Sequence, residues 1–397
     1  MKEMRTAIVG GGAAGFFLAV NLKEMMPEME VSVFEKSKRF LAKVEVSGGG
    51  RCNCTNSFAS VKDLRQVYPR GHQLMKRLFK VFDYRDAYQW FEHHGVPLVT
   101  QADECVFPVS QDSHSIIQCF LHEARHHGVN VYTERKIESL EDLAAYDFIV
   151  VTTGGSPRID GLRWLEPSGV EIIPPVPSLF TFNIKDDALR SLMGTVVEDA
   201  SVMIPGTKMK SSGALLITHW GMSGPAILKL SSYAARLLHE NNYHLPIAVN
   251  WVGHTPMAVM DELRACMTDH PQKQLTSFRP FGLSGRLWDY LLRKSLGARC
   301  TNRWMNLNQK ELNRLANILC NDVYQIEGRA PFKDEFVTCG GVSLESVYPQ
   351  TLECKTCPRL FFAGEVLDID GITGGFNFQA AWTTAYVVAT GIRGYCK

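Results

Sequence analysis

Apolar side chains in the first part of the chain recur in an order that predicts alternating strands and helices. A short strand at 6–8 precedes a glycine-rich turn, a helix over 16–26 and a second strand over 31–34. Helical spacing and then buried apolar runs continue the series at 72–94, 114–127, 129–133 and 147–151. This order is typical of a doubly wound α/β sheet.

The pattern changes after three closely spaced prolines at 174, 175 and 177. Residues 181–252 alternate in the manner of strands, with one helix near 225–239, and residues 257–321 have helical spacing. Near the C-terminus, a buried strand at 360–364 and a closing helix at 377–392 return to the strand-and-helix pattern of the first part of the chain. We therefore expect a discontinuous α/β domain, residues 1–180 and 339–397, interrupted by an insert at 181–338.

Composition and charge restrict the class of protein. The chain has 397 residues, of which 45% are hydrophobic and 21% charged, as in a soluble globular protein. Its net charge of +1 provides no overall field that would recruit nucleic acid or an anionic membrane. The first strand begins too early for a signal segment, and no uncharged apolar run is long enough to span a bilayer. We expect a cytoplasmic protein without a membrane partner.

Three glycines between the first strand and the first helix, Gly10, Gly12 and Gly15, form a G-x-G-x-x-G pattern. The first two allow a tight turn and a close approach to a pyrophosphate, and the third allows the helix to pack on the strand. The helix N-terminus favours an anion because its N–H groups are unpaired. Glu35 ends the second strand, where a carboxylate accepts hydrogen bonds from a ribose hydroxyl. The sequence therefore predicts an adenine dinucleotide site.

A second glycine-rich segment, FAGEVLD at 362–368 followed by GITGGFN at 371–377, changes the expected cofactor from NAD to FAD. A flavin extends well past the pyrophosphate and uses contacts from a distant part of the chain, which a nicotinamide dehydrogenase does not need. The turn at Gly374 and Gly375 directs the N-terminus of the last helix toward the expected flavin, where its dipole would stabilise negative charge. Because no His or Cys is an obvious tether, we expect FAD to be bound non-covalently.

Eleven cysteines are too sparse and irregular for a disulfide scaffold. Two close pairs, Cys52 with Cys54 and Cys354 with Cys357, leave a zinc site or a redox disulfide open as alternatives to buried packing. We predict no metal site, because the first pair lies inside a glycine-rich loop with another expected use.

The chain resembles the aminoacetone-oxidase-like family of FAD-dependent oxidoreductases, which have the glutathione-reductase-type flavoprotein fold. The resemblance rests on the two glycine motifs above and on SGGGRCNCTN at 47–56, VFPVS at 106–110, TTGG at 152–155, THWGMSGPA at 218–226 and VTCGGV at 337–342. It implies a Rossmann-like FAD-binding domain with an inserted β-barrel-like and helical domain. The chain departs from the family at 354–357 and at Ala385, away from the expected cofactor contacts.

The resemblance also implies which residues contact FAD. Lys36 would join Glu35 at the adenosine ribose, and the loop at 47–53 would lie along the flavin. The complete expected set is Gly10, Gly12, Ala13, Ala14, Gly15, Glu35, Lys36, Ser47, Gly48, Gly49, Gly50, Arg51, Cys52, Asn53, Thr153, Gly154, Gly364, Glu365, Gly375, Asn377 and Phe378.

Two residues are candidate catalytic acids or bases. His219 lies just before the helix expected near 225, and a histidine can exchange protons at neutral pH. Cys52 lies in the loop expected beside the flavin, where its thiol could donate a proton. Each also has a structural interpretation, as a hydrogen-bonded histidine and as a small apolar side chain.

Two substrate classes are compatible with these motifs and with the resemblance. The first is a small organic molecule that exchanges a hydride with flavin N5, by amine oxidation or by reduction of a conjugated C=C bond. The second is uracil in ribosomal RNA, which would be reduced to dihydrouridine. The chain has no second G-x-G-x-x-G after a strand, so an NAD(P)H donor would visit the flavin only transiently. A flavin-binding protein without turnover is a third possibility.

Residues 286–304 bear on the RNA alternative. They contain five cations and one acid, interleaved with three aromatic residues, namely Arg286, Arg293, Lys294, Arg299, Arg303, Asp289, Trp288, Tyr290 and Trp304. Cations suit phosphate contacts and aromatic rings suit base stacking. An amphipathic helix with a solvated basic face would produce the same pattern.

Overall fold

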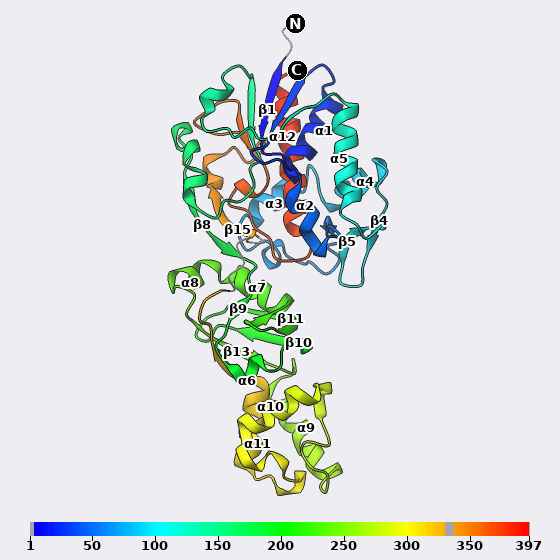
Figure 1. Ribbon diagram of the computed structural model, residues 1–397, viewed down its shortest axis with the longest axis vertical. Helices are drawn as coiled ribbons and strands as arrows, with labels where there is room; N and C mark the ends of the chain where they lie inside the picture. The colour runs from blue at the N-terminus through cyan, green and yellow to red at the C-terminus, as the bar shows by residue number, and fades with distance from the viewer. Residues whose placement is uncertain (1–3, 330–336, 397) are drawn as a thin grey trace. The chain divides into compact units, whose positions relative to one another are not determined.

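The computed structural model describes residues 4–329 and 337–396. The chain divides into two compact units, Met1–Pro177 with Val337–Lys397, and Ser178–Phe336 (Figure 1). No described helix is long and apolar enough to cross a membrane.

The first unit is built on a five-stranded parallel sheet of order β16-β7-β1-β2-β6. The strands are β1 (Arg5–Val9), β2 (Glu30–Phe34), β6 (Asn130–Tyr132), β7 (Phe148–Val151) and β16 (Leu360–Phe362). Ala7 and Ile8 in the centre are fully buried, because both faces of such a sheet are covered. The Rossmann-type α/β sheet predicted from the sequence is therefore confirmed, and the chain returns to it through β16.

Helix α1 (Ala13–Met25) packs against the last helix, α12 (Phe376–Tyr395), and against α5 (His114–His126). Phe17 of α1 lies with its ring centroid 4.6 Å from Trp90 of α4 (Tyr84–His93) and 5.2 Å from Trp382 of α12. Aromatic side chains thus join helices from the beginning, middle and end of the first unit.

Smaller elements complete the first unit. They are α2 (Ala42–Val46), α3 (His72–Leu78), a three-stranded antiparallel sheet of β3 (Thr55–Asn56), β5 (Cys105–Pro108) and β4 (Leu98–Thr100), and a pair of strands, β8 (Ile172–Ser178) with β15 (Val337–Val342). Strand β8 contains the three prolines that the sequence pattern treats only as a break. It has one strand partner, so its prolines do not disturb a central ladder.

The second unit contains a six-stranded antiparallel sheet of order β14-β13-β10-β11-β12-β9. Its strands are β9 (Phe182–Asn183), β10 (Val196–Met203), β11 (Lys210–Ile217), β12 (Gly221–Ser223), β13 (Pro246–Asn250) and β14 (Asp322–Gln325). Its helices are α6 (Asp187–Arg190), α7 (Pro225–Tyr233), α8 (Ala235–Glu240), α9 (Pro256–Asp269), α10 (Gly285–Leu296) and α11 (Gln309–Cys320). Buried aromatic residues, including Trp251 and Trp288, belong to its core. This curled antiparallel sheet with helices confirms the predicted β-rich and helical insert.

A histidine–carboxylate pair joins α1 to the end of α4 in the first unit. His94 Nε2 lies 2.8 Å from Glu24 Oε1, and the His94 ring stacks 3.8 Å from Trp90. The hydrogen bond from His94 lowers the pKa of Glu24 in spite of burial. Burial by itself would lower the pKa of His94, but hydrogen bonds to Glu24 and to the Trp90 carbonyl outweigh it and raise that pKa.

The pair should therefore stabilise the fold in a window of pH. The stabilisation that protonated His94 gives the folded state is complete below pH 6.5, the ordinary pKa of a histidine. It is lost as pH rises through the raised pKa of His94. The stabilisation that ionised Glu24 gives the folded state is complete above pH 4.5, the ordinary pKa of a glutamate. It is lost as pH falls through the lowered pKa of Glu24. Urea unfolding of wild type and His94→Gln should differ most between these values, by about 0.2–1 kcal/mol. A difference that does not change with pH would contradict this account.

Candidate functional site

The turn between β1 and α1 has the steric features of a dinucleotide-binding turn. A Cβ on Gly10 would lie 2.5 Å from the Thr152 carbonyl oxygen, and one on Gly15 would lie 2.1 Å from the Gly10 carbonyl oxygen. A Cβ on Gly12, in contrast, would have no neighbour within 4 Å, and no side chain caps α1 at this residue. The first and third glycines are thus required by packing, while the second leaves open space at a helix N-terminus. These features fit a pyrophosphate.

Glu35 lies at the carboxyl end of β2 and is held by the backbone. Its Oε2 accepts a hydrogen bond from the Gly11 N–H at 3.0 Å, and its Oε1 accepts from the Ser37 N–H at 2.8 Å and the Ser37 hydroxyl at 2.7 Å. The carboxylate is therefore oriented beside the glycine turn, where a ribose would reach it. Lys36 is exposed.

The segments that follow β7 and β16 meet the same turn. The Thr152 hydroxyl donates to the Gly10 carbonyl at 2.8 Å, with Thr153 and Gly154 immediately after it. A Cβ on Gly364 would lie 2.9 Å from the Cβ of Ala14, so the end of β16 touches the first turn of α1. Parallel strands place their carboxyl ends at one edge of the sheet, where ligands bind in open α/β folds.

The two distant glycine-rich segments at 47–56 and 371–382 are joined by hydrogen bonds. The Asn56 amide donates to the Gly374 carbonyl at 3.0 Å, and the Trp382 indole donates to the Cys54 carbonyl at 2.8 Å. When the Asn53 amide is oriented so that both its oxygen and its nitrogen have hydrogen-bond partners, its oxygen accepts from the Gly375 N–H at 3.2 Å. The predicted flavin loop therefore lies at the N-terminus of α12.

The loop at 47–52 is shaped by its own backbone. Gly48, Gly49 and Gly50 all have positive φ, and the Cys52 N–H donates to the Ser47 carbonyl at 3.0 Å. A Cβ on Gly49 or Gly50 would have no neighbour within 4 Å, so this part of the loop borders open space. The Arg51 guanidinium lies 4.3 Å from the Phe107 ring centroid, which directs it toward β5.

Two expected cofactor residues at the start of α12 have side chains that are already engaged. The Asn377 amide accepts from the Gly371 N–H at 2.8 Å and donates to the Gly371 carbonyl at 2.9 Å. The Phe378 ring stacks on Trp382 with centroids 5.5 Å apart. Any cofactor contact of Asn377 would therefore use its backbone N–H at the helix N-terminus.

An ion pair between Arg70 and Asp370 was missed in the sequence. Two N–H groups of the Arg70 guanidinium donate to the fully buried Asp370 carboxylate, and Arg70 is 17% exposed. The neighbouring Tyr68 hydroxyl donates to the Phe376 carbonyl at 2.8 Å, at the first residue of α12. An Asp within the apolar segment 366–372 was the available signal, because a buried carboxylate requires a partner.

Cysteine chemistry receives little support from the environments of the thiols. Cys52 is fully buried, and burial raises its pKa to about 12 against an opposing hydrogen bond with Ser47. Burial, with Cys354 nearby, also raises the pKa of Cys357, whereas reactive thiols have lowered values. Among the described residues, no group of three or more His, Cys, Asp or Glu side chains could hold a metal ion.

The second catalytic candidate, His219, lies in the second unit. It is exposed in the turn between β11 and β12, with its ring 4.7 Å from that of Trp220. The sequence pattern predicts a helix directly after His219. In the structure, strand β12 lies between His219 and that helix, α7, which begins at Pro225.

Two of the three aromatic residues of 286–304 are buried. Trp288 and Trp304 are fully buried and stack on each other with centroids 6.4 Å apart, which favours the amphipathic-helix interpretation of this segment over the RNA interpretation. Two of the cations are also engaged, since Lys294 pairs with Asp322 at 2.6 Å and Arg299 pairs with Glu311 at 2.9 Å.

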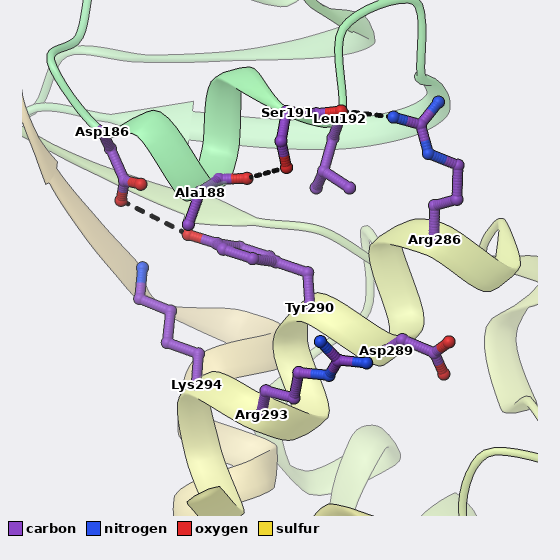
Figure 2. A pocket seen from close by; sticks show the side chains of 9 residues that line it. All are labelled: Asp186, Ala188, Ser191, Leu192, Arg286, Asp289, Tyr290, Arg293 and Lys294. Carbon is purple, nitrogen blue, oxygen red and sulfur yellow. Dashed lines mark hydrogen bonds between the residues drawn. The ribbon is translucent and has the colours of Figure 1, made fainter.

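A groove of about 610 Å³ remains between α6 and α10 (Figure 2). Its lining contains three cations and two carboxylates among its nine residues, Asp186, Ala188, Ser191, Leu192, Arg286, Asp289, Tyr290, Arg293 and Lys294. The Arg286 guanidinium donates to the Ser191 carbonyl, and Arg293 makes no ion pair with any described residue. The groove is therefore only weakly basic.

Comparison with known proteins gives matches along almost the whole chain. The sequence pattern of the HI0933-like protein Rossmann domain matches residues 4–391. A 3-dehydro-bile acid delta(4,6)-reductase of Clostridium scindens is 25% identical over 96% of this chain and 97% of its own. Ribosomal RNA dihydrouridine synthases of Haemophilus influenzae and Escherichia coli are each 25% identical, over 97% and 98% of both chains respectively.

Proposed function

We propose that this chain, which belongs to the HI0933-like Rossmann-domain family of FAD-dependent oxidoreductases, reduces a C=C bond. In the proposed reaction this bond is conjugated to a carbonyl group in a small organic substrate. Two contacts within one unit carry the proposal. Gly364 approaches the first turn of α1, and the glycine-rich segments 47–56 and 371–382 meet at the N-terminus of α12. The names of the curated relatives support the reaction, because both describe saturation of a C=C bond next to a carbonyl group.

The residues of the site have separate tasks in this proposal. FAD, once reduced by the electron donor, would supply the hydride for the substrate carbon farther from the carbonyl group. The open N-terminus of α1 would hold the pyrophosphate, and Glu35 would orient the adenosine ribose. The N-terminus of α12, at Gly375 and Phe376, favours negative charge at the flavin edge. A proton must reach the carbon next to the carbonyl group, and Cys52 and His219 remain the candidate donors.

The test is anaerobic reduction of the purified protein by NADH or NADPH, followed by addition of an α,β-unsaturated ketone. Heat or acid should first release free FAD, because the proposed binding is non-covalent. We expect a nicotinamide to act as transient electron donor and the ketone to reoxidise the flavin with a saturated product. Reduction of the oxidised protein by an amine, with no reaction of the ketone, would instead support an aminoacetone-oxidase-like activity.

The second candidate substrate is uracil in ribosomal RNA, supported by two relatives and by the cations of the groove between α6 and α10. Arg286 and Arg293 lie on the same side of α10, seven residues apart, and both are exposed (Figure 2). They are the suitable residues to test, because Lys294 is engaged by Asp322.

If RNA phosphates bind in this groove, Arg286→Ala with Arg293→Ala should weaken binding of ribosomal RNA fragments. The slope of log K against log salt should become shallower by about 0.7–0.9 for each phosphate that no longer has an arginine partner. Arg314→Ala, an exposed change on α11 outside the groove lining, is the matched control. The same slope in all three proteins would exclude the groove as an RNA-binding surface and leave the small-molecule proposal.

A further inference from the structure

Lys43 occupies an unusual place beside the expected cofactor site. The Leu41 N–H donates to the Gly11 carbonyl at 2.8 Å, so α2 begins against the glycine turn. From the second residue of α2, the Lys43 ammonium reaches Glu365 Oε2 at 2.9 Å, directly after β16. Strand β7 lies between β16 and β1 in the sheet. The ion pair therefore connects the segment after β16 with α2, which begins at the turn after β1.

The ion pair lies next to the open N-terminus of α1. Gly364, which precedes Glu365, approaches Ala14 so closely that a Cβ on this glycine would lie 2.9 Å from the Ala14 Cβ. The Lys43 ammonium thus pairs with the residue that follows this close contact, and Gly12 borders open space in the same turn. We infer that an anion in that space lies on the side of the turn from which the lysine side chain extends.

The two members of the pair are held differently. The Lys43 side chain is 59% exposed, whereas the Glu365 side chain is 19% exposed. Glu365 also accepts a hydrogen bond from the Thr338 N–H at 2.9 Å through its other oxygen. Glu365 thus keeps a backbone donor if Lys43 moves away, and the exposed lysine can change partner at small cost.

We propose that Lys43 binds the pyrophosphate of the cofactor and that, without cofactor, Glu365 holds it in reserve. The diphosphate carries more negative charge than one carboxylate, so it attracts the ammonium more strongly. The α1 N-terminus supplies only about half an elementary charge. Lys43 supplies a full positive charge that neither the glycine turn nor Glu35 provides. The inference rests on the proposed FAD site, but it does not depend on the substrate.

The test measures binding of ADP and FAD to cofactor-free protein. Because a charged hydrogen bond is lost, Lys43→Met should weaken both ligands about tenfold to hundredfold. Lys43→Arg should retain most of the affinity. Lys38→Met changes an exposed lysine, paired with Glu134 at 4.0 Å, in the segment before α2 and should bind both ligands like wild type.

Glu365→Gln separates a phosphate ligand from a structural role. ADP lacks the flavin half, so contacts of Glu365 with that half do not influence its binding. We expect Glu365→Gln to bind ADP more tightly, because it removes a negative charge that competes with the diphosphate for Lys43. Equal weakening by Lys43→Met and Glu365→Gln would mean that the pair only supports the fold and would overturn the proposal, as would unchanged ADP binding by Lys43→Met. Failure of wild type to bind either ligand would instead show that the FAD site itself is wrong.

Discussion

Arg70→Met should destabilise the first unit by about 3–5 kcal/mol, because it leaves the carboxylate of Asp370 buried without its bidentate guanidinium partner. Urea unfolding followed by tryptophan fluorescence measures this free energy. Arg65→Met is the matched control in the same part of the chain. Its pair with Asp63 is exposed, so we expect no measurable change.

The stability should also be recovered when both charges are removed. Replacing Arg70 by Met and Asp370 by Leu together removes both charges of the pair, and such apolar replacements are often neutral or stabilising. If the single and the double variant are equally unstable, the ion pair is not the cause of the destabilisation. An Arg70→Met protein as stable as wild type would contradict the prediction directly.

The Arg70–Asp370 pair also bears on the cofactor. The Ile372 N–H donates to the Val67 carbonyl at 2.9 Å, and Tyr68 donates to the first residue of α12. The segment around Arg70 therefore holds the turn that leads into α12 from one side, while Asn56 holds Gly374 from another. Since both contacts fix the helix N-terminus proposed to face the flavin, we expect Arg70→Met to release FAD at lower urea concentrations than wild type.

The glycine turn could be predicted from the sequence because it depends on local geometry. The glycine turn combines a strand, three glycines and a helix within one short segment, so steric rules assign each glycine its place. The Arg70–Asp370 and Lys43–Glu365 pairs could not be predicted in this way. Each joins residues about 300 positions apart, which only the closing strand and helix bring together.

The two interpretations of 286–304 can be separated by helical period. The RNA interpretation depends on residue types alone, whereas the amphipathic-helix interpretation depends on their spacing. Leu287, Trp288, Leu291 and Leu292 recur at the spacing of one helix face, and the structure buries all four. Arg286 and Arg293 lie on the remaining face. The period alone would have assigned Trp288 to the core and separated it from the cations.

Lys294 of α10 differs from the neighbouring arginines because it pairs with a buried carboxylate. The carboxylate of Asp322 is almost fully buried and accepts hydrogen bonds from the Tyr324 hydroxyl at 2.5 Å and the Trp251 indole at 3.1 Å. Lys294, with its side chain 28% exposed, supplies the cation at 2.6 Å and covers the Tyr324 ring at 3.9 Å. This lysine therefore supplies the counter-charge for a buried carboxylate of the second unit.

We expect Lys294→Met to destabilise the second unit by about 3 kcal/mol, because the stem is retained while Asp322 loses its counter-charge. Arg293→Met, one residue earlier and exposed, should change the free energy of unfolding by less than about 0.5 kcal/mol. Urea unfolding of both variants measures the contrast, and Lys294→Met with Asp322→Asn should recover part of the stability. Equal stability of the two single variants would place Lys294 among the solvated cations. It would then be available to phosphate, and the groove between α6 and α10 would be more basic than its contacts indicate.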